Sequence, residues 1–556
     1  MIPPSADNPN GLTSILFSFV LLQFAGIELL FTHLRFLRQR SLQILILLVV
    51  SLVCLRPSNG RYFMGFEYED AYIYTANSRY LLFNQDFSVD PLQTQTCVLG
   101  SMSDCTIGAT YGGHFVTLPF IAYFIHRLLG YHPYTVCCIN YVASLISVLV
   151  LYFLCLRLTG DVVCSLVAAL VYAVCPAMCL FHTSALAETT SSLFLLVYVS
   201  CFLSVFIHKE CSRGTARWLL WTLLGVSLGL ALLTKRENLA LLALPLFAVP
   251  AMSLKWSREA KGLLVWTGIT VALAVLIMSG FKILQIETGE TGDIGAPTFS
   301  VRYSLVLIPL FCKALLTFKW FSISTVLFLC GVAAMFRRST RHSGWTVVIG
   351  LFFAYFLVYT GHYRSFYFVH YGTVTPFESL RYITNPFPLF AAVTGLGTNE
   401  VRGWRRKIGG WWRYDRLVFG GIATVWVLSS VGMARSLRRE WQEVEWENRI
   451  APVVSTLQNV NVSRDYIVTE LSMVFQVFGA STVRIVDQYS VGTAIPSNVL
   501  VQSLKEARTV WWLRRNGAND EDMKRYPDFY RFVQQYDPRD CARVPGPFSL
   551  CRLMVR

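Results

Sequence analysis

The sequence predicts an α-helical polytopic membrane protein, with about 11 to 13 transmembrane helices and a small C-terminal extramembrane α/β domain. Two observations lead to this fold class. The 556-residue chain is 54% hydrophobic and only 15% charged, whereas a soluble protein carries roughly 25% charged residues. Its apolar residues are also gathered in runs of about 16 to 23 residues, near the length that crosses a bilayer. A dozen such runs in one chain exclude buried core helices of a soluble protein as the general explanation.

The candidate spans extend from the N-terminus to residue 434. They lie near residues 12–34, 41–56, 136–156, 162–178, 189–207, 218–233, 239–254, 262–281, 320–336, 344–360, 380–397 and 417–434. The first run contains Glu28 but has neither a basic leader nor a small-residue cleavage site. We therefore expect it to be a retained span rather than a signal peptide.

Charge sets the orientation of these spans. When residues 34–40 (LRFLRQR) are placed in the cytoplasm, the inner loops contain far more Lys and Arg than acidic residues, whereas the outer loops are balanced. This is the asymmetry that the positive-inside rule describes. The net charge of +15 is then largely topogenic, and no nucleic-acid partner is expected.

This orientation divides the chain into three parts. Residues 1–40 form an N-terminal span and a basic cytoplasmic turn, residues 41–434 a transmembrane domain, and residues 435–556 an external α/β domain. The transmembrane domain contains the long outer loop 57–135. A second outer loop, 282–319, begins rich in glycine and ends as an apolar segment that is re-entrant or interfacial.

Two helices are expected in the first outer loop. EDAYIYTANSRYLL, from Glu69, places Tyr72, Ala76 and Arg79 at helical spacing, and 113–130 (GHFVTLPFIAYFIHRLLG) is too short and too polar for a span and suits the membrane interface.

The tail has a different pattern. It alternates strand-like runs (YIVTEL, TVRIVDQY, TVWWLRR, FSLCRLMV) with helix-like ones (NRIAPVVSTLQ, NVLVQSLKEA, YPDFYRFVQQY). This alternation predicts an α/β domain. Two outer cysteine pairs, Cys97 with Cys105 and Cys541 with Cys551, are close enough to form disulfides in an oxidising compartment, and both pairs are left open.

Three carboxylates crowd together at the start of the first outer loop. In GFEYEDAYIY, Glu67, Glu69 and Asp70 fall within four positions. Crowded carboxylates raise one another's pKa, and such a group can take a proton from an incoming hydroxyl. These residues are therefore candidate general bases, and the alternative is that they are solvated loop acids.

Cations also occur on the outer side, against the positive-inside trend. In LALLTKRENLALLALP, Thr234 to Asn238 form a polar island that contains Lys235 and Arg236, and Arg381 opens a span in ESLRYITNPFPLF. Such cations can hold an anionic headgroup such as phosphate. The alternatives are side chains that snorkel to the interface and a local Arg381–Glu378 pair.

His182 and Glu188, in HTSALAE, lie at the outer end of a span and either line the site or are interface polarity. The nine histidines show no metal-binding spacing. No cofactor is required by the sequence, and a divalent metal is left open.

The order of these segments resembles the GT-C glycosyltransferases. The matching segments are the acid-bearing outer loop, GHFVTLPFIAYFIHRLLG, the apolar stretch ending in HTSALAETTSSLFLL, LGLALLTKREN and LRYITNPFPLF. Among this superfamily the chain is most similar to the group of protein O-mannosyltransferases and lipid A aminoarabinose transferases. The resemblance covers roughly residues 41–434.

The resemblance implies roles for particular residues. The family's Asp-Glu pair, with an acid as catalytic base, is matched in reversed order by Glu69-Asp70, and the Thr-Lys-Gly segment by Thr234-Lys235-Arg236, with Arg in place of Gly. A lysine of the family is missing, and His114 stands nearest to its position. The late Arg-Tyr-x-x-x-Pro pattern is matched by Arg381, Tyr382 and Pro386.

The resemblance also implies the reaction. The donor is a sugar carried on a polyprenyl phosphate, and the acceptor is a hydroxyl of a glycan, lipid or protein on the periplasmic or lumenal side, with inversion at the sugar carbon. The expected location is a bacterial inner membrane, with the endoplasmic reticulum as the alternative. Two other classes are kept: a transporter or flippase for a lipid-linked sugar, which predicts pseudo-symmetric halves, and a non-catalytic scaffold.

Overall fold

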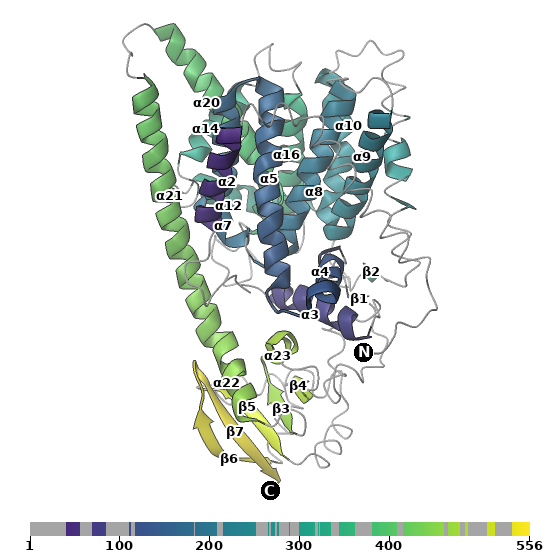
Figure 1. Ribbon diagram of the computed structural model, residues 1–556, viewed down its shortest axis with the longest axis vertical. Coiled ribbons are helices and arrows are strands. Elements are labelled where there is room, and N and C mark those ends of the chain that lie inside the picture. Colours follow the sequence, from purple (N-terminus) through teal and green to yellow (C-terminus); the bar gives the residue numbers. More distant parts are fainter. Residues whose placement is uncertain are drawn as a thin grey trace.

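In the computed structural model the chain forms a bundle of α-helices with a small mixed sheet beyond one end of it (Figure 1). The structure describes residues 41–55, 69–84, 111–112, 117–182, 184–207, 215–251, 265, 268–272, 275–276, 288–289, 300–316, 321, 323–334, 344–361, 381–408, 415–460, 465–478, 484–487, 509–516 and 536–555. The expected first span, 12–34, and the Cys97–Cys105 pair lie outside these residues.

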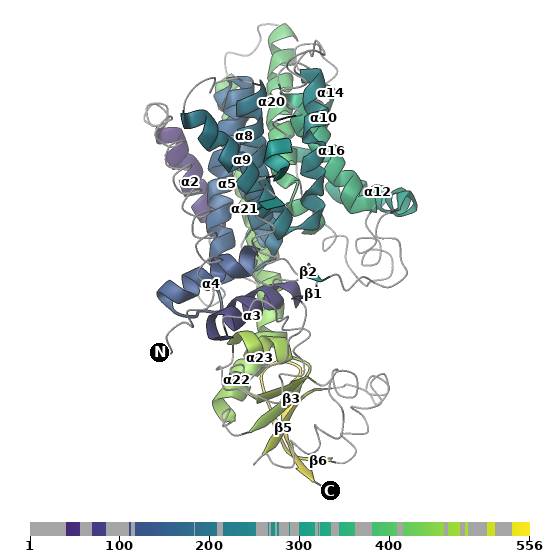
Figure 2. The same ribbon diagram turned by 90° about the vertical axis from the view of Figure 1, so that its right-hand side faces the viewer.

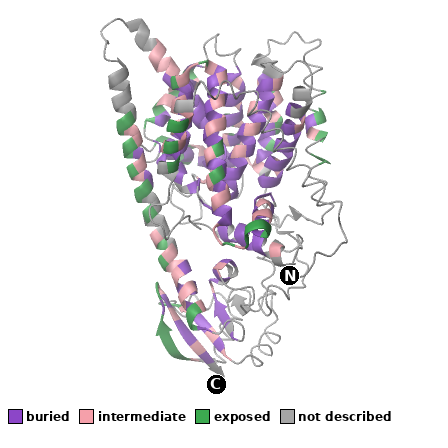
Figure 3. Cartoon of the chain, viewed as in Figure 1, coloured by how far each residue is buried: buried purple, intermediate pink, exposed green. Residues whose placement is uncertain are grey.

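The bundle helices coincide with apolar runs of the sequence and run between its two ends (Figures 1 and 2). They are α2 (Ser41–Leu55), α5 (Thr135–Thr159), α6 (Val162–Val174), α8 (Ala187–Phe202) with its π-helical extension η3 (Leu203–Ile207), α9 (Thr215–Thr234), α10 (Leu244–Ala251), α14 (Ser324–Ala334), α16 (Trp345–Gly361), α20 (Phe387–Ile408) and α21 (Asp415–Glu445). Burial is concentrated inside the bundle, while the described side chains of α21, from residue 424 on, are mostly exposed or half-buried (Figure 3).

Two helical stretches of the described residues, Thr135–Thr159 and Ala187–Val205, are long and apolar enough to cross a membrane. Others, such as Trp345–Gly361, are apolar but between 10 and 17 residues long. The mostly helical fold is thus confirmed, and the number of membrane crossings stays a prediction.

Three predicted spans are interrupted rather than continuous. The span 162–178 breaks at Cys175, whose ψ of 119° is extended, because the residue before a proline avoids the α-helical region; α7 (Pro176–Phe181) follows. The span 380–397 breaks before Pro386 into α19 (Arg381–Thr384) and α20, and 239–254 starts within the 3₁₀ helix η4 (Arg236–Ala243).

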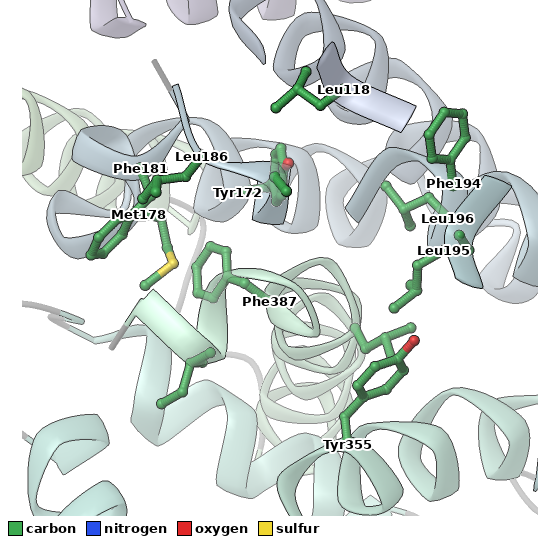
Figure 4. Packing of buried hydrophobic residues seen from close by; sticks show 14 of the residues in the cluster. Leu118, Tyr172, Met178, Phe181, Leu186, Phe194, Leu195, Leu196, Tyr355 and Phe387 are labelled. Atoms are coloured by element: carbon green, nitrogen blue, oxygen red, sulfur yellow. The ribbon is translucent and has the colours of Figure 1, made fainter. Parts of the chain in front are cut away.

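Glycines bring two bundle helices into backbone contact. A Cβ on Gly331 of α14 would overlap the Val393 carbonyl of α20, and one on Gly397 of α20 would overlap the Leu327 carbonyl of α14. Small residues allow such close approach between helices where hydrophobic driving force is weak. Aromatic side chains fill the wider gaps. Tyr172 and Phe387, for example, stack with ring centres 6.0 Å apart (Figure 4).

Two helices of the segment 57–135 lie across the end of the bundle that faces the sheet (Figures 1 and 2). These are α3 (Glu69–Asn84) and α4 (Thr117–Leu129), which pack against each other. Both were predicted as helices. A further outer helix, α12 (Val301–Leu316), packs on α16 through Leu307 and Phe311 and leaves Leu305 exposed; whether it is re-entrant or interfacial stays open.

The C-terminal sheet is five-stranded, in the order β4-β3-β5-β7-β6. Its strands are β3 (Tyr466–Thr469), β4 (Arg484–Asp487), β5 (Val510–Arg515), β6 (Tyr536–Arg543) and β7 (Phe548–Val555). β3 is parallel to β4 and β5, and β7 is antiparallel to β5 and β6. The helices η5 (Trp446–Ile450), α22 (Ala451–Asn459) and α23 (Ser472–Phe478) precede or follow β3. Two-residue strands β1 (Tyr111–Gly112) and β2 (Thr288–Gly289) pair in parallel between the outer loops.

The four strand-like runs of the tail are strands β3, β4, β5 and β7. Strand β6 was missed, because YDPRDCAR has charged residues and a proline instead of alternating apolar ones. It is an edge strand, where proline is tolerated, and it contains a bulge between Arg539 and Ala542. A disulfide joins Cys541 of β6 to Cys551 of β7, so one of the two cysteine pairs left open is bonded.

Candidate active site

Three charged side chains from distant segments meet inside the bundle. Glu188, in the first turn of α8, accepts hydrogen bonds on Oε1 from Lys235 Nζ at 2.8 Å and from Arg381 Nε at 2.7 Å. The Glu188 side chain is fully buried, and those of Lys235 and Arg381 are 7% and 13% exposed. We call these three residues the charge cluster. Arg381 is thus bonded to Glu188, and its local alternative, Glu378, lies outside the described residues.

A break in helical structure places Lys235. Helix α9 ends at Thr234, and Lys235 is extended, with φ −157° and ψ 136°, before η4 begins. Hydrogen bonds of neighbouring residues hold this break in place. Thr234 Oγ1 donates to the Leu230 carbonyl, and the backbone N–H of Asn238 donates to the Lys235 carbonyl. The polar island of the sequence is therefore the point where the chain leaves the α-helix and turns its cation toward α8.

Behind the charge cluster lies a network of buried polar side chains. Asn238 Nδ2 donates to Ser191 Oγ at 2.8 Å, and Asn238 Oδ1 accepts from Tyr355 at 2.6 Å and from Asn385 at 3.0 Å. Asn385 Nδ2 also bonds the Tyr359 hydroxyl at 3.2 Å. This network ties η4 to α8, α16 and the α19–α20 break. Because buried polar groups are costly unless satisfied, it fixes the relative position of these elements.

The charge cluster has an aromatic neighbour and a positive balance. Lys235 Nζ is 5.9 Å and Arg381 Cζ is 6.0 Å from the centre of the Tyr382 ring, within cation–π range. Among these three residues two cations share one carboxylate, a net charge of +1, while Glu237 lies within electrostatic reach of the neighbouring Tyr355 and Tyr359. Lysine and arginine side chains in a low-dielectric site can bind an anion such as phosphate.

The cluster lies at the end of the bundle that carries α3 and α4. Helix α5 starts at Thr135, shortly after α4 ends. Early in α5, Asn140 Nδ2 donates to the carbonyls of Ser184 and Leu186 at 2.6 Å each, which fixes the chain just before Glu188. Helix α4 also contacts α9, whose last residue precedes Lys235. The acid-bearing loop and the cations are thus on one side of the bundle.

For several other predicted site residues the structure describes the backbone but not the side chain. Glu69 and Asp70 are the first two residues of α3, and Arg236 is the first of η4. Their side chains, together with Glu67 and His114, lie outside the described residues. Tyr382 borders the charge cluster.

His182 lies apart from the charge cluster's ion pairs. Its ring packs on Tyr172 at 4.4 Å, and its carbonyl accepts from Ser144 Oγ at 3.1 Å. Within the described residues, these contacts tie His182 to α5 and α6.

Asn140 and Asn385 were not among the predicted site residues, and Asn238 was predicted only as the end of the polar island. Each is an amide in or beside an apolar run, which was the available signal, since a buried amide needs partners. Their partners are remote in sequence and could not be named without the fold. In the described part of the chain no group of three or more His, Cys, Asp or Glu is arranged to hold a metal ion.

Comparisons with known proteins agree with this architecture. A family model described as dolichyl-phosphate-mannose-protein mannosyltransferase matches residues 114–279. No curated protein matches the sequence. Among solved structures, apo ArnT from Cupriavidus metallidurans is similar over 92% of this chain and 97% of its own, with a TM-score of 0.60 and 14% identity.

Two further structures are similar. ArnT from the same organism, bound to undecaprenyl phosphate, matches with a TM-score of 0.58 and 13% identity, over 93% of this chain and 98% of its own. The Archaeoglobus fulgidus oligosaccharyltransferase, in complex with zinc and sulfate, matches with a TM-score of 0.52 and 11% identity, over 91% of this chain and 72% of its own.

The chain therefore has the fold of the GT-C glycosyltransferases, and the resemblance noted in its sequence is confirmed. Of these two proteins, ArnT is matched along nearly the whole length of both chains. At such low identity the likeness concerns the fold.

Proposed function

We propose that this protein is a glycosyltransferase that moves a sugar from a polyprenyl-phosphate donor to an acceptor hydroxyl on the outer side of a membrane. The observation that carries the proposal is the charge cluster, in which Lys235 and Arg381 converge from distant segments at the end of the bundle where α3 begins. The GT-C fold and the ArnT structure with undecaprenyl phosphate support it.

The proposed chemistry is a single displacement. The acceptor oxygen attacks the anomeric carbon and loses its proton to Glu69 or Asp70, with Glu67 as a further candidate, while the bond from that carbon to the phosphate oxygen breaks. The polyprenyl phosphate leaves with one more negative charge. Lys235 and Arg381, together with Arg236, which follows Lys235 in the sequence, are proposed to stabilise that developing charge, which is the kind of electrostatic effect that contributes most to many enzymes. The sugar configuration is inverted.

The proposed location is the outer face of a membrane, in the periplasm or a lumen. The Cys541–Cys551 disulfide supports this location, because disulfides persist in oxidising compartments and are rare in the cytosol. A bacterial inner membrane is proposed, and the endoplasmic reticulum is the alternative.

The proposal is tested by incubating the purified protein with a panel of polyprenyl-phosphate sugars and candidate acceptors and identifying products by mass spectrometry. We expect one donor to be consumed with release of polyprenyl phosphate. Glu69→Gln or Asp70→Asn should reduce turnover by about 10²-fold or more, as loss of a general base does, without impairing membrane insertion. Normal turnover in both variants would refute the assignment of the base, and vectorial movement of the donor without cleavage would favour a flippase.

A further inference from the structure

Helix α3 is enclosed between the bundle and the C-terminal domain. It contacts α4 and α5 on one side and α23 on the other. All the described side chains between its third and eleventh residues are buried: Ala71, Tyr72, Tyr74, Thr75, Ala76, Ser78 and Arg79. Because these side chains are buried against both neighbours, the position of α3 depends on both of them.

Tyr131 connects these neighbours. It lies in the short connection between α4 and α5, and its hydroxyl donates a hydrogen bond of 2.7 Å to the carbonyl of Val477, 346 residues later. Val477 belongs to the last turn of α23, where backbone carbonyls have no partner within the helix. Tyr131 therefore satisfies the end of a helix in the C-terminal domain with a side chain from the bundle.

The same tyrosine holds α3. The guanidinium carbon of Arg79 lies 4.7 Å from the centre of the Tyr131 ring, and Arg79 is 3% exposed. The His126 ring of α4 packs 4.9 Å from the Tyr131 ring, and its Nε2 is 3.1 Å from Ser78 Oγ of α3. Tyr131 is thus in contact with residues of α3, α4 and α23, and we call this group of contacts the Tyr131 junction.

We propose that Tyr131 is a positioning residue, through which the C-terminal domain sets the position of α3 and of the carboxylates at its start. The proposal rests on the proposed function, because it assumes that Glu69 or Asp70 is the base. Asp70 and Arg79 are nine residues apart, about 14 Å along a rigid helix. Fixing the Arg79 end therefore sets the tilt of α3 and where its first turn stands, and a displacement of about 1 Å can cost about 10²-fold in rate.

The test is Tyr131→Phe, which keeps the ring against Arg79 and His126 and removes the hydroxyl that bonds the Val477 carbonyl and the Arg79 side chain, the two contacts that join α23 to α3. We expect kcat to fall by about tenfold with the donor KM unchanged, because an interaction used to align the base is lost while donor binding is kept. Amide hydrogen exchange should become faster in both α3 and α23, because each loses part of what holds it.

Tyr152→Phe is the matched control. It also removes one tyrosine hydrogen bond between elements, from Tyr152 of α5 to Gln43 Oε1 of α2 at 2.8 Å. Tyr152 lies 17 residues into α5, about 26 Å from the end where the Tyr131 junction lies. Its kcat and the exchange of α3 should stay at the level of the unaltered protein.

The outcomes separate the two proposals. If Tyr131→Phe keeps full kcat, or changes only the donor KM, or leaves exchange in α3 unaltered, the positioning role is refuted even though the enzyme works. If the unaltered protein transfers no sugar from any donor, the proposed function fails. Faster exchange of α3 in Tyr131→Phe alone would then still support the mechanical link between α23 and α3.

Discussion

At the scale of single residues, the charge cluster decides what the bundle can bind. Glu188 is fully buried and holds both Lys235 and Arg381 through one oxygen. Two buried cations in contact with a single carboxylate are stable only while that charge is present, because an unpaired buried charge is strongly destabilising. The stability of the bundle therefore depends on the charge of Glu188.

Glu188→Gln should therefore lower the free energy of unfolding by about 3 to 5 kcal/mol. The substitution keeps the shape of the side chain and removes the charge that both cations need. Thermal unfolding in detergent, followed by tryptophan fluorescence, measures the effect.

Asp161→Asn is the control for that experiment. Asp161 pairs with Arg402 at 2.7 Å, but both side chains are about one quarter exposed, at 26% and 27%. Asp161 also caps α6 by accepting from the backbone of Val163 and Cys164, which asparagine does equally well. The loss should stay below about 1 kcal/mol, and an equal loss in both variants would show that burial does not distinguish the pairs.

At the scale of elements, the close packing of α14 against α20 depends on glycines at their contact. Gly397→Ala should destabilise the bundle by at least about 2 kcal/mol, because the added methyl group meets the Leu327 carbonyl, which is backbone and cannot rotate away. Thermal unfolding and the yield of folded protein report the effect. Gly403→Ala, on the same helix with no atom near its Cβ position, should be neutral or stabilising by up to about 1 kcal/mol. Similar losses for both would mean that α14 and α20 pack less closely than described.

The docking of α3 on α4 should depend on pH. Burial lowers the pKa of His126 from 6.5 to about 4, and the nearby Arg79 adds to this shift. When α3 is undocked from α4, His126 is exposed and binds a proton more readily than it does in the docked state. The docked state therefore loses stability as pH falls from about 6.5 to about 4, by up to about 3 kcal/mol. Above pH 6.5 the histidine is neutral in both states and has no effect.

Amide hydrogen exchange of α3, measured between pH 7 and pH 4.5 and corrected for intrinsic exchange rates, tests this expectation. Protection should decrease toward low pH in the unaltered protein. In His126→Gln, which keeps a nitrogen donor near Ser78 Oγ but does not titrate in this range, the decrease should disappear. A decrease of the same size in the variant would contradict the role of His126.

At the scale of the whole molecule, the described residues couple the C-terminal domain to the bundle along α21 and at α23, where the Phe478 ring also lies 5.8 Å from that of Tyr134. Helix α21 runs from the bundle to the sheet region (Figure 2), and the Tyr131 junction joins α23 to α3 and α4. The sheet itself is closed at its edge by the Cys541–Cys551 disulfide, which spans a ten-residue separation.

Replacing both cysteines by serine should lower the stability of this domain by about 2 to 3 kcal/mol, because the unfolded chain is no longer constrained. In the unaltered protein, rapid alkylation of intact cells followed by non-reducing mass spectrometry should recover the two cysteines as one linked peptide pair. Recovery of both as alkylated thiols would contradict the proposed outer location of the domain.

The sequence was sufficient for features that depend on local pattern. Apolar runs predicted where the bundle helices lie, the spacing of Tyr72, Ala76 and Arg79 predicted α3, and alternating apolar residues predicted β3, β4, β5 and β7. Edge strand β6 was not predicted, because apolar and polar residues do not alternate in it. It is a strand because it pairs with β7. Pro176 and Pro386 were the sequence signals for the helix breaks at Cys175 and Asn385. The predicted spans were nevertheless drawn as continuous across both prolines.

By itself the sequence determined a mostly helical fold with a C-terminal sheet, marked Lys235 and Arg381 as cations against the positive-inside trend and indicated Glu188 as a candidate site residue, because hydropathy and charge are properties of each residue. Only the tertiary structure decided that these three charges pair with one another and that Tyr131 joins α3 to α23. Those contacts bridge up to 346 residues, and which distant groups meet is set by the packing of the bundle as a whole.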